Sequence, residues 1–134
     1  MRKVKKVLRL YHISEENQNN KVFKPRIPIS ALDSEFEDNR TKRICFASSM
    51  SGAYKAIDYG MYNATYYVHV PIGLDSIVKR EKLYRPDEKE VIDCKTTGEY
   101  WVLSNVKLKC IGIAKFKCKH NSNSIVINWI KKFK

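Results

Sequence analysis

The apolar residues of this chain fall mostly in short runs bounded by polar segments, and this pattern predicts strands rather than long helices. The clearest run is Thr65–Pro71, in which β-branched and aromatic residues predict a strand that ends at the proline. Val106–Lys117 alternates between apolar and polar residues, as a half-buried strand does, and Gly112 within it predicts a bulge or bend. Three shorter strands are predicted at Val7–His12, Arg43–Ala47 and Glu99–Leu103.

One segment carries clear helix signals. Ser48 or Ser49 provides an N-cap for a helix that runs through about Tyr59 and ends at Gly60. The terminal segment Ile125–Lys134 fits either a strand or a short amphipathic helix, and its pattern does not distinguish them. Five or more strands against one helix predict an α+β fold with a mostly antiparallel sheet.

The length of 134 residues predicts a single domain that spans the whole chain and buries one hydrophobic core. Polar and proline-containing segments predict the loops. Asn17–Asn20 is entirely polar, and Pro25 and Pro28 keep the stretch after it extended. Tyr84–Val91 is charged and contains a proline, so a loop is expected there as well.

The chain is strongly basic, with 26 Lys and Arg against 14 Asp and Glu and a net charge of +12. Such a charge raises the local concentration of anionic ligands, whether nucleic acid, an acidic protein surface or a pyrophosphate cofactor. A solvated, lysine-rich surface accounts for the charge equally well. The excess is spread over Met1–Arg9, Lys107–Lys119 and Lys131–Lys134.

The four cysteines form no CxxC pair, which predicts neither a disulfide framework nor structural zinc. Cys118 and His120 are two positions apart, but no second pair completes a tetrahedral metal site. The basic N-terminal segment lacks an uninterrupted apolar stretch because Arg9 breaks it, so no signal peptide is expected. No apolar run approaches the ~20 residues that span a bilayer. These features predict a cytoplasmic protein with no membrane partner.

Four short motifs follow one another along the chain. Leu10–Ser14 reads Leu-Tyr-His-Ile-Ser, Val22–Pro28 holds an arginine between prolines, and Arg43–Ala47 reads Arg-Ile-Cys-Phe-Ala. Gly98–Val102 reads Gly-Glu-Tyr-Trp-Val and is followed by Val106–Lys109, Val-Lys-Leu-Lys. This ordered set resembles the NAD-binding core of the ADP-ribosyltransferase superfamily, in its poly(ADP-ribose)-polymerase-like branch. The resemblance covers most of the chain and implies a compact split antiparallel β-sheet with one main helix.

The resemblance also implies NAD as the substrate. Glu99 would carry the catalytic carboxylate, which stabilises the positive charge that develops at the anomeric carbon as nicotinamide leaves. This step needs no metal. His12 would hold a ribose hydroxyl with support from Ser14, and the backbone of Ile13 would face the nicotinamide carboxamide.

Further residues would complete the NAD site. Arg26 would contact the adenosine or the pyrophosphate, for which a guanidinium is well shaped. Ser48 and Tyr54 would lie around the same cleft, with Tyr54 stacked on the nicotinamide ring, and Cys45 takes the position of the family's tyrosine. Each residue also has an ordinary explanation: a strand histidine or glutamate is often structural, Ser48 is a helix cap, and Tyr54 suits a helix core position.

Three positions depart from the family pattern. Ile13 replaces the glycine after the histidine, Cys45 removes one wall of ring stacking, and Thr97 stands where arginine-directed members place an acidic or amide residue before Glu99. These departures argue against chain elongation and against an arginine target. The sequence therefore predicts a mono-ADP-ribosyltransferase that modifies a protein or nucleic acid.

The Lys-, Ile- and Asn-rich composition suits a bacterial or phage effector or counter-defence protein. Two other functions stay open. One is an RNA 2′-phosphotransferase, which also consumes NAD. The other is a non-catalytic basic module that binds a nucleotide or nucleic acid or inhibits a partner.

Overall fold

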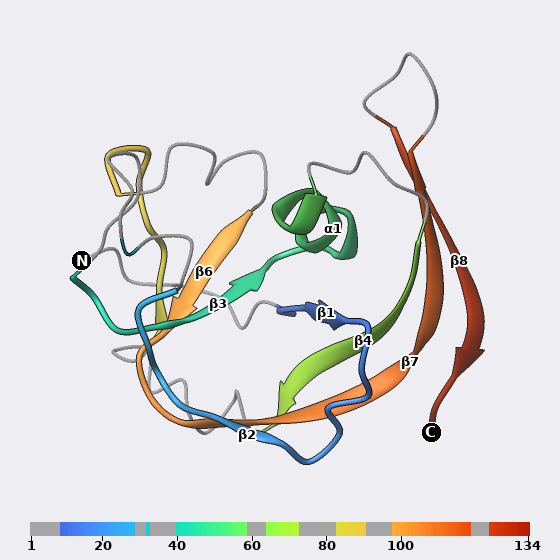
Figure 1. The fold of residues 1–134 in the computed structure, drawn as a ribbon, viewed down its shortest axis with the longest axis horizontal. Coiled ribbons are helices and arrows are strands. Elements are labelled where there is room, and N and C mark those ends of the chain that lie inside the picture. Colours follow the sequence, from blue (N-terminus) through green and yellow to red (C-terminus); the bar gives the residue numbers. More distant parts are fainter. Residues whose placement is uncertain are drawn as a thin grey trace.

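A computed structural model describes residues 9–28, 32, 40–58, 64–72, 83–90, 98–118 and 124–134 of the chain. In these segments one helix and eight strands form two sheets with the helix beside them (Figure 1). The elements in chain order are β1 (His12–Ser14), β2 (Val22–Phe23), β3 (Ile44–Ala47), α1 (Met50–Asp58), β4 (Ala64–Ile72), β5 (Leu83–Tyr84), β6 (Glu99–Val102), β7 (Val106–Cys118) and β8 (Ile125–Lys132).

The larger sheet is built on the long antiparallel pairing of β4 with β7. Its strand order is β1-β4-β7-β2, and β8 pairs with the far end of β7. The strands alternate as their sequences predict, because Val106, Leu108 and Phe116 are buried while Lys107 and Lys115 are exposed. Hence one face of this sheet builds the core and the other carries lysines.

Gly112 lies where β7 bends. The register of β4 against β7 shifts beside it, and a second shift follows in the pairing with β8. A Cβ atom at Gly112 would lie 2.4 Å from the carbonyl oxygen of Lys131 and 2.7 Å from the ring of Trp129, so only glycine lets β8 approach this closely. The predicted bulge is confirmed.

The smaller sheet has the order β3-β6-β5, again antiparallel. It joins the larger sheet through Tyr11 and Ala47, whose backbones exchange hydrogen bonds of 2.8 and 3.0 Å. The chain just before β1 therefore pairs with the end of β3, while β1 itself pairs with β4. The two sheets part at this point, and Figure 1 shows α1 lying in the angle between them.

Two apolar clusters hold this arrangement. One lies around the smaller sheet and the start of β7, and contains Phe46, Tyr100 and Leu108. The other lies beneath α1, where Tyr54 packs against Tyr66 and Phe116 at ring distances of 6.2 and 5.2 Å. Both clusters include β3 residues; the first also contains Leu10, just before β1, and the second contains Ile13 of β1, so the junction between the sheets is packed from both sides.

The predicted α+β class with a mostly antiparallel sheet is confirmed. Ile125–Lys134, for which the sequence left two possibilities, contains strand β8 rather than a helix. The start of the predicted Tyr84–Val91 loop is instead the end of the short strand β5. The predicted helix end at Tyr59 and Gly60 lies outside the described residues, as do Val7, Cys94, Thr97 and His120. Within the described segments, no helix is both long enough and apolar enough to cross a membrane.

Candidate functional site

A pocket with a volume of about 120 Å³ lies where the two sheets part. Residues from β1, β3, α1 and β6 line it. Four of the predicted site residues come together here: His12, Ile13, Cys45 and Glu99. The remaining wall is apolar and consists of Tyr11, Phe46, Ala47, Ala53, Ala56 and Ile57.

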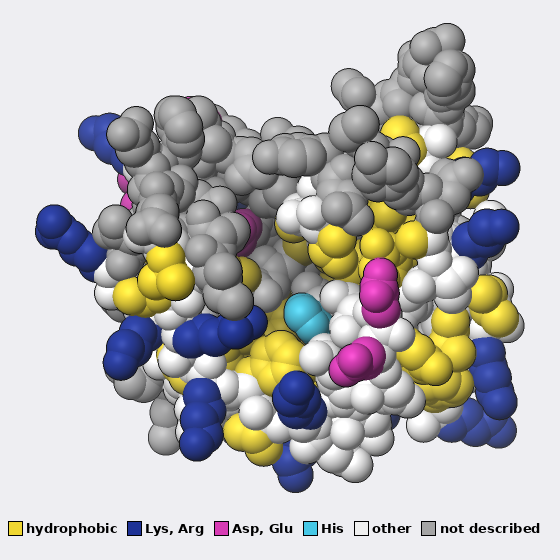
Figure 2. Space-filling view, viewed as in Figure 1, with side chains coloured by type: hydrophobic (Ala, Val, Ile, Leu, Met, Phe, Trp, Pro, Cys, Tyr) yellow, Lys and Arg dark blue, Asp and Glu magenta, His cyan; other side chains and the backbone are white. Residues whose placement is uncertain are grey.

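A larger groove with a volume of about 790 Å³ adjoins this pocket and shares His12, Cys45 and Ile57 with it. The segment from Gln18 to Pro28 forms much of its wall, and Arg26 lines it as predicted. Figure 2 shows a histidine ring within the hollow and Lys and Arg side chains below it. The pocket and the groove thus form one continuous hollow with a small apolar end and a larger basic end.

Glu99 is fixed by the residue two positions further along β6. The indole Nε1 of Trp101 donates a hydrogen bond of 2.6 Å to Oε2 of Glu99, and residues i and i+2 of a strand share one face. Trp101 is itself fully buried. The Arg43 guanidinium lies 4.2 Å from the Trp101 ring centroid, and the Tyr84 ring packs against the same indole at 5.4 Å. A buried cation and the Tyr84 ring therefore hold the donor that orients the Glu99 carboxylate.

Ser48 has a structural relation to Glu99. Its backbone N–H donates a 2.9 Å hydrogen bond to the carbonyl of Gly98, which has a φ of +65°. A Cβ atom at Gly98 would lie 2.4 Å from the Ser48 hydroxyl oxygen, which can rotate away, so it is the positive φ that favours glycine at this position. Ser48 lines neither hollow, and the cap of α1 is Ser49, whose hydroxyl accepts from the N–H of Gly52 at 3.0 Å.

His12 is held by a glutamine from the following loop. Its Nε2 lies 2.9 Å from Oε1 of Gln18, an atom that only accepts, so Nε2 carries the proton and Nδ1 of the neutral ring is left as an acceptor. The edge of Phe23 packs against the same imidazole at 5.2 Å. Burial lowers the pKa of His12, the Gln18 hydrogen bond opposes this, and the positive charges of Arg26 and Lys21 lower it further. The ring is therefore neutral at pH 7.

A second histidine lies directly behind the first. His69 of β4 is the cross-strand partner of His12, and the two rings are 5.8 Å apart. Nε2 of His69 accepts a 2.9 Å hydrogen bond from the backbone N–H of Gln18, and Nδ1 lies 3.3 Å from the carbonyl oxygen of His12. Nδ1 therefore carries the single ring proton. Burial, followed by repulsion from His12, lowers the pKa of His69 to about 4.

The stability of the fold is expected to fall as the pH drops from 6.5 to about 4, because the unfolded chain protonates His69 in this range and the folded protein does not. The loss by pH 4 is on the order of 3 kcal/mol, and above pH 6.5 this histidine causes no change. Urea unfolding at pH 7.0, 5.5 and 4.5 measures the effect. In His69→Gln the free energy of unfolding should depend less on pH in this range, and an unchanged dependence contradicts the assignment.

Tyr54 does not occupy the predicted position. Its side chain is fully buried among Tyr66 and Phe116, so it presents no ring face to the pocket. The face of α1 that lines the pocket carries Ala53, Ala56 and Ile57, which follow the three- and four-residue spacing of one helix face. Small alanine side chains give the pocket its depth there.

Ser14 lies beside the site but outside both hollows. Its hydroxyl accepts a 3.1 Å hydrogen bond from the N–H of Glu16 and so shapes the turn after β1. Of the described histidines, His12 alone has an exposed part, since His69 is fully buried.

Comparison of the chain with protein-family models, curated proteins and solved structures finds no match.

Sequence reasoning missed two groups that fix the site. Gln18 lies in the polar Asn17–Asn20 loop, and only the fold brings it between the two histidines. Trp101 had a sequence signal, because it follows Glu99 at a two-residue interval in a strand. Within the described residues, no cluster of three or more His, Cys, Asp or Glu side chains is arranged to hold a metal ion.

Proposed function

We propose that the chain is an NAD-dependent mono-ADP-ribosyltransferase with an ADP-ribosyltransferase-like fold and an acceptor that is a macromolecule. One observation carries the proposal: His12 and Glu99, which come from different sheets, line the same pocket. A carboxylate and a neutral imidazole that face one apolar hollow can act on two sides of a ribose. The parting of the two sheets beside β1 also supports the resemblance to this fold.

The two parts of the hollow suit the two halves of NAD. Ile13, Ala53 and Ala56 make the small pocket apolar, which suits a flat aromatic ring such as nicotinamide. The groove beyond His12 contains Arg26 and Lys21, whose charges suit a pyrophosphate. Its volume of about 790 Å³ falls in the range of roughly 300–1,000 Å³ that is usual for small-molecule sites.

In the proposed reaction the bond between C1′ of the ribose and the nicotinamide nitrogen breaks. Nicotinamide leaves with the electron pair as a neutral molecule, and positive charge develops at C1′. The Glu99 carboxylate stabilises that charge and orients a ribose hydroxyl. An acceptor hydroxyl or amine then bonds to C1′ and loses its proton to the Glu99 carboxylate, which acts as the base.

His12 would hold the substrate rather than exchange protons. Gln18 occupies its Nε2, and the lowered pKa keeps Nδ1 unprotonated, so Nδ1 accepts a hydrogen bond from a ribose hydroxyl. Cys45 lines the pocket where a tyrosine would provide a stacking wall, and this favours a single transfer over chain elongation.

Wild-type protein is expected to bind NAD, and His12→Ala is expected to weaken binding by roughly tenfold, the loss of one good hydrogen bond to the ribose. Isothermal titration with NAD measures the affinity. Thermal stabilisation by NAD should rise with the logarithm of ligand over its dissociation constant.

Gln18→Ala serves as the companion variant, because it removes the partner that orients His12 and leaves the imidazole in place. We expect a smaller loss of NAD affinity than in His12→Ala. If the wild-type protein gives neither heat nor a thermal shift on addition of NAD, the chain does not bind NAD and the proposed function is wrong.

A further inference from the structure

We infer that a basic strip beside the site docks a single strand of nucleic acid, and that nucleic acid is the acceptor of the proposed transfer. The strip consists of Lys24, Lys42, Lys107 and Lys109. Docking is a separate property of the surface, whereas the acceptor role rests on the proposed function.

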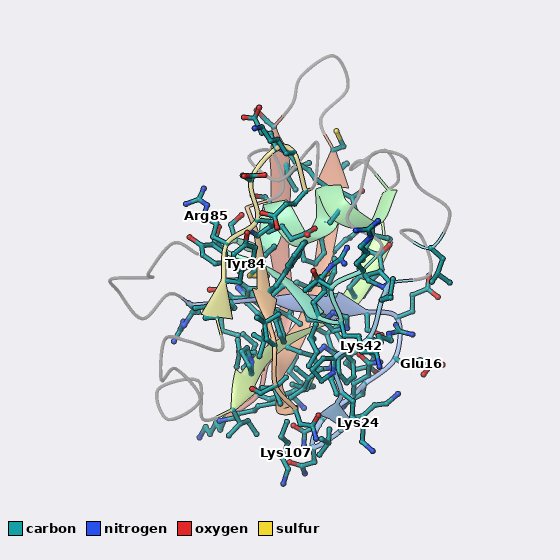
Figure 3. All side chains as sticks on the ribbon, turned by 90° about the vertical axis from the view of Figure 1, so that its left-hand side faces the viewer. Glu16, Lys24, Lys42, Tyr84, Arg85 and Lys107 are labelled. Carbon is teal, nitrogen blue, oxygen red and sulfur yellow. The ribbon has the colours of Figure 1, made fainter. Side chains whose placement is uncertain are left out.

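Strand pairing brings three of these lysines together. Val22 of β2 lies directly opposite Lys107 of β7, so both side chains lie on the outer face of the sheet. Lys109 follows Lys107 at a two-residue interval and shares that face, and Lys24 comes just after the end of β2. Lys42 precedes Arg43, which lines the groove and whose backbone is hydrogen-bonded to that of Arg26. Figure 3 labels Lys24, Lys42 and Lys107 on one side of the molecule.

The strip reaches the proposed site through Lys24, since Lys107 and Lys109 lie on the outer face of the sheet and Lys24 lines the groove. Lys24 lines the groove that continues past His12 into the pocket with Glu99. The positive charges of Lys21 and Arg26 in the same groove lower the pKa of His12. The electrostatic field of these groove residues therefore reaches the site. A strand lying along these lysines would therefore have a nucleotide at the mouth of the pocket.

The sequence segments that contribute the strip lysines contain no acidic residue that could balance their positive charge. Residues 17–32 and 40–57 contain no Asp or Glu, and none occurs from 100 to 134. NAD has a single pyrophosphate, for which Arg26 and Lys21 in the groove already provide positive partners. The lysines outside the groove therefore exceed what NAD requires.

Nucleic acid suits this surface better than an acidic protein does. The exposed lysines alternate with exposed aliphatic side chains, because Val22 is 50% exposed and Ile72, which is also opposite Lys107, is 40% exposed. A nucleic acid strand presents regularly repeated phosphates together with apolar base and sugar surface. A single strand leaves these bases unpaired and able to reach the pocket.

A charge-matched pair of variants tests docking. The strip variant replaces Lys42, Lys107 and Lys109 by glutamine. The control variant replaces Lys115, Lys117 and Lys134, which are also exposed, by glutamine. Because each variant loses three lysines, the net charge of the two proteins is identical. Lys115 lies about 27 Å from Lys107 along the same strand at ~3.4 Å per residue. The probe is a fluorescein-labelled 20-nucleotide oligothymidylate, and anisotropy is measured from 50 to 200 mM NaCl.

The strip variant should lose at least tenfold in affinity at 100 mM NaCl, and the slope of log K against log salt should fall by about 2, three contacts at roughly 0.7 each. The control should change by less than threefold. Equal losses in both variants, or equal affinity of wild-type protein for polyglutamate, overturn docking, because attraction by net charge alone would then explain the binding. Thermal unfolding confirms that both variants are folded.

The acceptor role is tested with the same proteins, NAD labelled in its adenine part, and an unlabelled 20-nucleotide single strand of mixed sequence, whose adenine, guanine and cytosine bases carry the amino groups that oligothymidylate lacks. Wild-type protein and the control variant should transfer label to the oligonucleotide, while the strip variant releases nicotinamide at the wild-type rate but transfers at least tenfold less label. Nicotinamide release without label on the oligonucleotide overturns the acceptor role and leaves the proposed reaction intact. Strip-dependent binding without nicotinamide release overturns the proposed function and leaves docking intact.

Discussion

Glu99→Gln is expected to reduce the rate of nicotinamide release from NAD by a hundredfold or more, while the affinity for NAD stays within about threefold of wild type. The substitution keeps the shape of the side chain but removes the negative charge that stabilises the developing cation, a loss of about 2.7 kcal/mol or more in the transition state. Since Glu99 also lines the pocket in the ground state, retained affinity separates catalysis from binding. Single-turnover kinetics and calorimetry measure the two quantities.

Glu16→Gln is the matched control. Glu16 is exposed in the turn after β1, and its substitution changes the net charge by the same amount (Figure 3). It should leave nicotinamide release unchanged. A Glu99→Gln protein that turns over NAD as fast as wild type would show that Glu99 is an ordinary strand residue bonded to Trp101.

Trp101→Ala is expected to reduce the free energy of unfolding by about 3–5 kcal/mol, because it empties a fully buried site between the Arg43 guanidinium and the Tyr84 ring. The loss is large against the total stability of about 5–15 kcal/mol that is usual for a domain. Urea unfolding at pH 7 measures the change. The alanine variant therefore reports the packing of the site rather than its chemistry.

Trp101→Phe separates the two roles of this residue. It keeps an aromatic ring between Arg43 and Tyr84 but removes the N–H that donates to Glu99, a hydrogen bond to a charged group worth about 1.5–3 kcal/mol. We expect the protein to fold, to bind NAD as wild type does, and to turn it over on the order of tenfold more slowly, because the carboxylate is less well positioned. Wild-type turnover in this variant contradicts a positioning role for the indole.

The strands of this protein could be predicted because their cause is local. Alternating burial in Val106–Lys117 and β-branched residues in Thr65–Pro71 specify a pleated, half-buried conformation at short range. The bulge at Gly112 was predictable for the same reason. The two-residue strands β2 and β5 carry too little pattern to be recognised, since each exists only through pairing with a longer neighbour.

The terminal segment shows that the local sequence pattern does not always determine the secondary structure. Ile125–Lys132 fits a strand or a helix in isolation, and the free edge of β7 decides, because backbone groups there pair with an extended chain. The close approach of the two strands depends on the absence of a side chain at Gly112.

The site, like the fold, could be predicted from the sequence only in part. The sequence by itself determined that His12 and Glu99 lie on strands, in an order that pointed to a shared site, because residue type and strand pattern are local properties. Only the tertiary structure decided which face of α1 borders the pocket, so that Tyr54 packs in the core while Ala53 and Ala56 line the pocket. It also decided that Gln18 lies between two histidines. Both depend on how the two sheets part, and this is set by packing between residues far apart along the chain, which no local pattern records.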